Sequence, residues 1–347
     1  MKLLVITQKI DKDDDVLGFF IRWVEEFEKK VSSVSVICLE KGVNSLPKSI
    51  PVFSLGKETK QSRFSYISNF YKRIISMNST YDTVFVHMNQ EYVLLGALIW
   101  KLRGKKIFMW RNHPNGTWKT KLAVFLSDRV FCTSEFSFTA KFKKTEIMPA
   151  GIDTDYFRDN HDDQRSDSPL LYLGRISSIK KVEILVESLL LLSKESDTFK
   201  ADLYGGPVKV DSEKGYFENL KEKAKEIEER NLVSFPGSVP NNKTVEIYNS
   251  HGVLVNLTPT GSFDKVILEM MACGGLALVS NRSYENIFPK KWHSILMFNE
   301  NDAIDLAEKI KQIHLLDKET KKEIGVMLRS IVLEQHSLKS LIQKIVC

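Results

Sequence analysis

The chain has 347 residues, of which 43% are apolar and 27% are charged. This length fits two domains of ordinary size, and the composition excludes collagen-like, disordered and disulfide-rich proteins. The four cysteines lie far apart, and no stretch approaches the roughly 18 apolar residues of a membrane-spanning helix. We therefore expect a cytoplasmic protein without a metal site.

Charge is divided unevenly along the chain. Residues 1–150 contain 24 Lys and Arg against 14 Asp and Glu, a net charge of +10, whereas the remaining residues contain 26 against 30. A basic first half predicts contact with something anionic: a membrane surface, a phosphate-bearing acceptor or a nucleic acid. No recognised nucleic-acid-binding motif is present, so we expect no nucleic-acid partner.

Apolar periodicity along the first half alternates between strand and helix patterns. We predict strands over 2–7, 34–38, 81–87, 106–110 and 129–133, and helices over 16–31, 92–102 and 118–127. Such alternation predicts a parallel sheet with helices on both faces.

A polar segment over 159–169 (DNHDDQRSDSP) is typical of a linker, and the alternation restarts after it. We predict strands over 170–173, 201–204, 233–235, 252–256 and 276–279. The helices are predicted over 182–192, 215–229, 245–250, 265–272, 302–315, 318–334 and 338–345. Two doubly wound Rossmann-like units in tandem predict a cleft lined by loops at the carboxyl ends of both sheets.

The first loop, 8–18, contains the acidic run 13–15. Asp14 and Asp15 permit three interpretations: a metal-binding D-x-D, a solvated acidic loop before a helix, or a contact with acceptor hydroxyls. Gly18 would let the backbone approach a ligand. The loop lacks G-x-G-x-x-G, which disfavours a nicotinamide-dependent dehydrogenase.

Three polar residues, Arg111, Asn112 and His113, directly follow the predicted strand 106–110. Their position at a strand end predicts that they line the cleft. A lone histidine is more often structural than catalytic, but the position of His113 after a strand keeps both interpretations open.

The segment 171–181 (LYLGRISSIKK) places Arg175 and Lys180 between a predicted strand and a helix. A diphosphate leaving group carries at least two negative charges, and fixed cations at such a strand end would stabilise it. The bland alternative is solvated surface charge.

The segment 258–269 (TPTGSFDKVILE) joins a predicted strand to a helix through a Gly/Ser loop. Backbone N–H groups and the positive end of a helix dipole form an anion site of general type. Ser262 is a plausible N-cap, and Glu269 could accept hydrogen bonds from two ribose hydroxyls.

At these residues the chain resembles the retaining glycosyltransferases of family 4, which have the GT-B fold. The resemblance rests on the pieces LYLGRISSIKKVEILVESL, LYGGP, FPGSVPNNKTVEIYNSHGVLVNLTPT and GSFDKVILEMMACGGLALVS, and more weakly on VFCTSEFSFTAKF and IMPAGIDTDYF. It implies an α/β protein of two doubly wound parallel-sheet domains facing a central cleft. Residues 1–152 would form the acceptor-side domain and 153–329 the donor domain, with a helix at about 330–347 packing back on the first.

The resemblance also implies roles for particular residues. Arg175 and Lys180 would hold the donor pyrophosphate, Glu269 would hold the nucleotide ribose, and His113 would lie near the transferred sugar. The remaining donor-binding residues implied are Gly174, Gly205, Gly206, Ser262, Phe263, Asp264, Lys265 and Val266. On the acceptor side the candidates are Asp14, Asp15, Gly18, Arg111 and Asn112.

Two departures from the family pattern concern the donor sugar. The first acid of the family's E-x7-E motif is replaced by Gly261, and the glycine after the motif's phenylalanine is replaced by Asp264. Asp264 is a candidate to take over the missing sugar contact.

The implied activity is retaining transfer of a hexosyl group from a UDP- or GDP-sugar, with no cofactor required, in cell-surface polysaccharide or glycoconjugate synthesis. A polyprenyl-linked acceptor would agree with the basic first half. The segment 62–77 mixes aromatic and basic residues, which suits a peripheral helix on the inner face of the membrane or a helix packed on the sheet. A nucleotide-sugar epimerase, a non-enzymatic nucleic-acid-binding protein and a degenerate member that binds donor without efficient transfer are the alternatives.

Overall fold

The computed structural model describes residues 1–347 apart from 15, 161–164, 166–167, 209–212, 214 and 262. The described chain forms two compact units. The first comprises Met1–Gly151, Pro240–Asn242 and Ser337–Cys347, and the second comprises Ile152–Val239 and Lys243–His336.

The first unit contains a parallel sheet with the strand order β3-β2-β1-β4-β5-β6-β7 among its described residues. The strands are β1 (Lys2–Ile10), β2 (Ser33–Lys41), β3 (Val52–Ser54), β4 (Thr83–His87), β5 (Lys106–Trp110), β6 (Arg129–Cys132) and β7 (Thr145–Ile147). The sequence did not predict β3 and β7, because three residues are too few to display a period of two.

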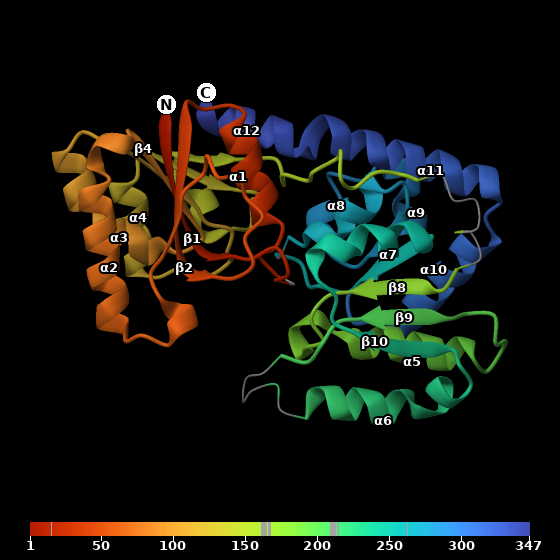
Figure 1. The fold of residues 1–347 in the computed structure, drawn as a ribbon. Helices are drawn as coiled ribbons and strands as arrows, with labels where there is room; N and C mark the ends of the chain where they lie inside the picture. The colour runs from red at the N-terminus through yellow and green to blue at the C-terminus, as the bar shows by residue number, and fades with distance from the viewer. Residues whose placement is uncertain (15, 161–164, 166–167, 209–212, 214, 262) are drawn as a thin grey trace. The chain divides into compact units, whose positions relative to one another are not determined.

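Both faces of this sheet are covered by helices (Figure 1). The helices are α1 (Phe20–Glu28), α2 (Arg63–Ser76), α3 (Gln90–Leu102), α4 (Trp118–Leu126) and α12 (Leu338–Val346). In β1, Leu3 and Val5 join a core with α1 and α12, whereas Leu4 and Ile6 join a second core with α2, α3 and α4. Alternate side chains of a strand point to opposite faces, which explains why residues 3–6 of this strand are all apolar.

The C-terminal helix α12 belongs to the first unit. Its Leu341 is fully buried in the core shared with α1. The guanidinium of Arg129 on β6 donates to the carbonyl oxygens of Lys344 and Ile345 at 3.0 Å each and pairs with Glu146 at 2.8 Å. A cation at the end of a helix satisfies carbonyls that have no partner within the helix.

The second unit contains a parallel sheet with the strand order β10-β9-β8-β11-β12. The strands are β8 (Leu170–Leu173), β9 (Ala201–Tyr204), β10 (Val233–Gly237), β11 (Val253–Asn256) and β12 (Leu276–Val279). The helices are α5 (Val182–Leu192), α6 (Tyr216–Glu229), α7 (Thr244–Ser250), α8 (Lys265–Ala272), α9 (His293–Leu296), α10 (Ala303–Leu315) and α11 (Lys318–Ile331). In Figure 1, α5 and α6 lie on one side of this sheet, and α7 and α8 lie on the other.

Two details of the second unit differ from the sequence-based expectation. The helix predicted over 318–334 ends as α11 at Ile331 and continues as one π-helical turn over Val332–His336. The predicted linker 159–169 lies largely outside the described residues.

The order of strands in the second unit determines where a ligand can bind. The chain runs outward from β8 through β9 to β10 and then crosses back to β11 on the other side of β8. Ligands of open α/β sheets bind outside the carboxyl ends of the strands at such a reversal. The loops after β8 and β11 are therefore the first place to look for a site.

Candidate functional site

The ends of β8 and β9 approach each other very closely. The Gly174 N–H donates to the Tyr204 carbonyl at 3.0 Å, and the Gly205 N–H donates to the Gly237 carbonyl at 2.9 Å. A Cβ atom on Gly205 would lie 1.8 Å from the Gly174 carbonyl oxygen, so no other residue fits there. Gly174 and Gly205 therefore determine the backbone position at which the loop with Arg175 and Lys180 leaves the sheet.

Lys180 joins the loops that follow β8 and β11. Its ammonium donates to the hydroxyl of Thr258 at 3.0 Å and to the carboxylate of Asp264 at 2.5 Å. The Lys180 and Asp264 side chains are 15% and 21% exposed, so solvent screens this ion pair only in part. The structure therefore brings the predicted cation to the start of the helix that bears Glu269.

Asp264 is held as a carboxylate by its neighbours. Burial alone would raise the pKa of Asp264, but the charge of Lys180 and hydrogen bonds from Lys180, Thr258 and Asn256 lower that pKa below its ordinary value. All three donors bind the same oxygen of the carboxylate, Oδ2. Asp264 therefore positions Lys180 in this structure, and the sugar contact expected of Asp264 stays a prediction.

Glu269 lies on the buried face of α8 and is 5% exposed. The hydroxyl of Tyr248, on α7, donates to Glu269 Oε2 at 2.8 Å. Burial and the nearby Glu269 carboxylate raise the pKa of Tyr248 well above its ordinary value, so this phenol stays protonated and remains a donor. One carboxylate oxygen is thereby fixed in place.

Arg175 differs from Lys180 in being exposed. Its carbonyl oxygen accepts a hydrogen bond from the hydroxyl of buried Tyr172 at 2.8 Å, which fixes the backbone at this point. In the part of the chain that the structure describes, no carboxylate lies within ion-pair distance of its guanidinium. Arg175 is therefore the cation available to an incoming anion, next to a lysine already oriented by Asp264.

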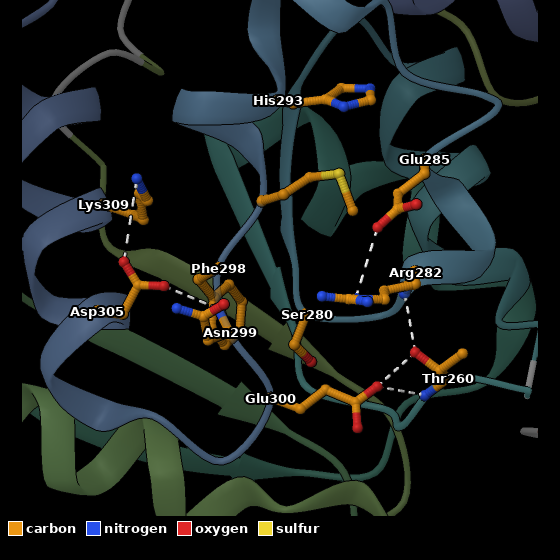
Figure 2. Close-up of a pocket in the computed structure, with 11 residues that line it drawn as sticks. Thr260, Ser280, Arg282, Glu285, His293, Phe298, Asn299, Glu300, Asp305 and Lys309 are labelled. Atoms are coloured by element: carbon orange, nitrogen blue, oxygen red, sulfur yellow. Dashed lines mark hydrogen bonds and ion pairs between the residues drawn. The ribbon is translucent and has the colours of Figure 1, made fainter.

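A polar cavity of about 670 Å³ lies beside the loop after β11. It is enclosed by the ends of β11 and β12 and by the helices α9 and α10 (Figure 2). Glu300 accepts a hydrogen bond from the Thr260 N–H at 2.7 Å within it. The next residue, Gly261, has φ of 100°, a left-handed conformation that glycine adopts without strain. A glutamate at position 261 would be strained in this backbone conformation. The carboxylate of Glu300 instead contacts Thr260, the residue before Gly261.

The loop after β1 uses its acidic residues for structure. Asp14 accepts hydrogen bonds from the N–H groups of Val16 and Leu17 at 2.9 and 2.7 Å and pairs with Lys9 at 2.8 Å. Gly18 is buried, and a Cβ there would lie 2.5 Å from the Asp14 carbonyl oxygen. Among the described residues, no group of three or more acidic, histidine or cysteine side chains is arranged to hold a metal ion.

The polar cluster after β5 divides into three different environments. Asn112 accepts hydrogen bonds from the Thr133 N–H at 3.2 Å and the Ser137 hydroxyl at 2.8 Å, so it joins two loops. His113 is exposed, and its Nδ1 accepts from the Asn115 N–H at 3.0 Å. Arg111 has a buried Nη1 with no hydrogen-bond partner among the described residues, and burial lowers the pKa of Arg111.

For several predicted site residues the contacts in the structure do not indicate a role. Asp15 and Ser262 lie outside the described residues. Phe263 stacks on Tyr284 at a centroid distance of 5.2 Å, and Lys265 and Val266 form the first turn of α8. The Gly206 carbonyl accepts a hydrogen bond from the Ile176 N–H at 2.9 Å.

Sequence reasoning missed the residues that orient the charged ones. Thr258 and Asn256 bind Asp264, and Tyr248 binds Glu269. Asn256 and Thr258 lie at the carboxyl end of β11. Polar residues at strand ends led to the prediction of Arg111 and Lys180, and the same signal would have predicted Asn256 and Thr258.

Comparison with known proteins identifies the class of enzyme. Residues 154–325 match the family described as "Glycosyl transferases group 1", and residues 13–111 match "Glycosyl transferase 4-like". The alpha-monoglucosyldiacylglycerol synthase of Streptococcus pneumoniae is 23% identical over 294 residues, which cover 73% of this chain and 63% of that enzyme.

Solved structures give the fold. Anabaena HepE, crystallised in complex with UDP and glucose, superposes with a TM-score of 0.77 at 16% identity, covering 100% of this chain and 98% of HepE. A glycosyltransferase from Rickettsia africae superposes with a TM-score of 0.72 at 17% identity, covering 100% and 97% of the two chains. The protein therefore has the GT-B fold, and the two families that match its sequence are both families of glycosyltransferases.

Proposed function

We propose that this glycosyltransferase moves a hexosyl group from a UDP- or GDP-sugar to a glycan or lipid-linked acceptor, with retention of anomeric configuration. The product would enter cell-surface polysaccharide or glycoconjugate synthesis. The observation that carries the proposal is the bridge that Lys180 makes between the loops after β8 and β11, beside the amino end of α8. The UDP bound to Anabaena HepE, which shares this fold, supports a nucleotide donor.

Breaking the bond between the sugar and the diphosphate leaves negative charge on the leaving oxygen. Arg175, Lys180 and the N–H groups at the amino end of α8 stabilise that charge as it develops. The acceptor oxygen bonds to the anomeric carbon on the same face, and its proton passes to an oxygen of the departing diphosphate. No metal is needed in this scheme, because the two cations supply the electrostatic stabilisation.

In this proposal Glu269 binds the nucleotide ribose. Its carboxylate is ordered by Tyr248 before any ligand arrives, so little conformational entropy is lost when ribose hydroxyls donate to it. The same preorganisation applies to Lys180, whose side chain is already fixed by Asp264 and Thr258.

The helices α2, α3 and α4 carry an outer surface suited to an anionic membrane, which we call the α2–α4 face. Its exposed large apolar side chains are Phe64, Ile67, Ile75, Leu98, Leu102, Trp118, Leu122 and Phe125. The ranges 63–77, 98–106 and 118–126 together contain nine Lys and Arg and no Asp or Glu. Apolar side chains beside basic ones bind the interface of a membrane with anionic lipids.

No helix among the described residues is long and apolar enough to cross a membrane. A peripheral location would bring the enzyme to a lipid-linked acceptor. The name of the pneumococcal relative, a monoglucosyldiacylglycerol synthase, gives a precedent for a lipid product, although the match spans less than two thirds of that enzyme.

The donor is tested by thermal unfolding in the presence of UDP-, GDP- and ADP-sugars. A ligand at 100 times its dissociation constant stabilises the folded protein by about 2.7 kcal/mol, so the true donor should stand out. Transfer is then measured with the variants Arg175→Ala and Lys180→Ala, for which we expect losses of about a hundredfold or more. Lys194→Ala, an exposed lysine on the same unit, is the charge-matched control.

Three further measurements separate the finer parts of the proposal. The anomeric coupling constant of the product distinguishes retention from inversion. Activity in excess EDTA tests whether a metal is required, and an epimerase would convert its nucleotide sugar without any acceptor. Full transfer by both cation variants would contradict the proposed role of the site.

Membrane binding is tested by co-sedimentation with vesicles of phosphatidylglycerol and phosphatidylcholine. Lys119→Glu and Lys121→Glu should each weaken binding to anionic vesicles, since a basic side chain near such a surface contributes about 1 kcal/mol. Lys194→Glu is the control. Binding that does not depend on the anionic lipid would contradict this assignment.

A further inference from the structure

A second cavity, of about 350 Å³, lies in the first unit and has no role in the donor site. Its wall is largely apolar and is formed by Leu39, Leu55, Tyr66, Ile67, Phe70 and Leu95. This volume falls within the range of roughly 300–1,000 Å³ that is typical of small-molecule sites.

The cavity lies where an α/β sheet binds ligands. Leu39 is near the carboxyl end of β2, Leu55 directly follows β3, and Asn89 follows β4 by two residues. The helices α2 and α3 complete the wall with Ile67 and Leu95. The cavity is therefore outside the carboxyl ends of neighbouring parallel strands, at the edge of the sheet where ligands of this architecture bind.

One polar group in the cavity wall has no partner among the described residues. Tyr92 is 8% exposed and lines the cavity, yet its hydroxyl makes no hydrogen bond within the described chain. Burial raises the pKa of Tyr92, so the hydroxyl is a donor at any physiological pH. This hydroxyl can therefore donate to an acceptor atom of a ligand in the cavity.

The mouth of the cavity carries charge. Arg63, Ile67 and Glu91 are exposed residues of the cavity wall, so the cavity opens to solvent beside one cation and one carboxylate. Arg63 begins α2 and lies in a segment, 59–77, that contains four Lys and Arg and no Asp or Glu. An apolar interior with an exposed arginine at its rim suits a hydrocarbon chain whose terminal phosphate lies on the Arg63 side of the mouth, away from Glu91.

We propose that this cavity binds the hydrocarbon chain of a phosphate-bearing lipid acceptor, with Arg63 facing the phosphate and Tyr92 donating to an oxygen of the ligand. The inference rests on the proposed function, because it specifies the acceptor class of the same enzyme. The α2–α4 face binds the membrane surface, whereas the cavity takes one chain out of it.

Two monomeric probes test the assignment by isothermal titration calorimetry below their critical micelle concentrations. Dodecyl phosphate carries a saturated chain and farnesyl phosphate carries a prenyl chain, so their relative affinities distinguish the two sources of hydrocarbon. We expect saturable binding of at least one probe with a stoichiometry of one. Inorganic phosphate, which lacks the chain, should not compete.

Variants that fill the cavity provide the decisive comparison. Leu95→Trp places a large ring inside the cavity, and Ile67→Trp, at a partly exposed position that tolerates substitution, narrows its mouth. Both should weaken the bound probe at least tenfold, while Leu315→Trp, the same change at an exposed position of the second unit, should not. Tyr92→Phe should weaken it about three- to tenfold, the range expected for one hydrogen bond.

The outcomes separate this inference from the proposed function. Absence of saturable binding, or equal affinity in wild type, Leu95→Trp and Ile67→Trp, would overturn the cavity assignment. A protein that binds a nucleotide sugar but neither probe contradicts the cavity alone. A protein that binds a probe but no nucleotide sugar contradicts the proposed donor chemistry.

Discussion

The ion pair between Lys180 and Asp264 gives a quantitative prediction. With 2.5 Å between its charged atoms, the attraction is about 7 kcal/mol at an effective dielectric constant of 20, before the cost of desolvation. Removing one partner of a buried pair costs about 3–5 kcal/mol, because the other charge is left without compensation. Since both side chains keep some exposure, we expect Lys180→Met to lower the free energy of unfolding of the second unit by about 3 kcal/mol.

The double variant Lys180→Met/Asp264→Asn should be less destabilised than Lys180→Met alone, because it removes the uncompensated carboxylate. We expect a coupling energy of about 2 kcal/mol from the cycle of four proteins, within the range for residues in direct contact. Exposed ion pairs give about 0–1 kcal/mol. A coupling energy below about 0.5 kcal/mol would refute the reasoning, since the pair would then behave as one at the surface.

The pH dependence of these proteins has a definite sign. The pKa of Asp264 is lowered from its ordinary value of 3.8, so its stabilisation is present above that value and is lost as the pH falls through the lowered pKa. In Lys180→Met the cation is gone and burial raises the pKa of Asp264. The difference in free energy of unfolding between wild type and Lys180→Met should therefore become smaller as the pH falls from 7 toward 4.

Urea unfolding followed by far-UV circular dichroism reports on the helices and strands of both units, and tryptophan fluorescence, which reports mainly on the first unit, supplies an internal control. Four of the five tryptophans, at positions 23, 100, 110 and 118, belong to the first unit. The fluorescence transition should be the same in all four proteins. A shared shift of both transitions would mean that the two units do not unfold independently and that the cycle reports on more than the pair.

Three further changes have expected outcomes. Tyr248→Phe leaves an oxygen of Glu269 without its donor and should cost about 1–3 kcal/mol in urea unfolding, with weaker UDP binding by calorimetry; unchanged UDP affinity would contradict the role of Glu269. Gly261→Glu restores the acid of the family pattern in a left-handed conformation and should destabilise by about 1–3 kcal/mol without improving donor binding, as thermal unfolding with the donor would measure. His113→Ala should leave the melting temperature unchanged, because this side chain is exposed, but lower kcat at least tenfold; an unaltered kcat would exclude contact with the transferred sugar.

Much of the fold could be predicted because its elements are long enough to display a period. Helices such as Val182–Leu192 and strands such as Lys106–Trp110 have the predicted bounds. The strand β7 is too short to show alternation, and the π-helical turn at Val332 interrupts a pattern that continues as helical in the sequence. Pattern reasoning detects periodicity, not changes in hydrogen bonding along a continuous helix.

The sequence predicted which charged residues belong to the candidate site but not which of them contact one another. Lys180 and Asp264 were both recognised, yet they are 84 residues apart, and nothing local in the sequence indicates that one neutralises the other. The same holds for Tyr248, whose hydroxyl meets Glu269 only because α7 and α8 pack together. Asp14 is the opposite case: its hydrogen-bond partners, Val16 and Leu17, are near neighbours in the sequence, and the acceptor contact expected of Asp14 stays a prediction.

The placement of α12 has a consequence for how the protein is made. The ribosome synthesises the chain from the amino end. One of the two cores of the first unit, however, includes Leu338, Leu341 and Ile345, which are synthesised last. Residues 152–336, which build the second unit, are synthesised in between, a delay of roughly ten to forty seconds at about 5–20 residues per second. The apolar side of α1 stays uncovered on the nascent chain for that interval, so the unit that is translated second is the one that can complete its folding first.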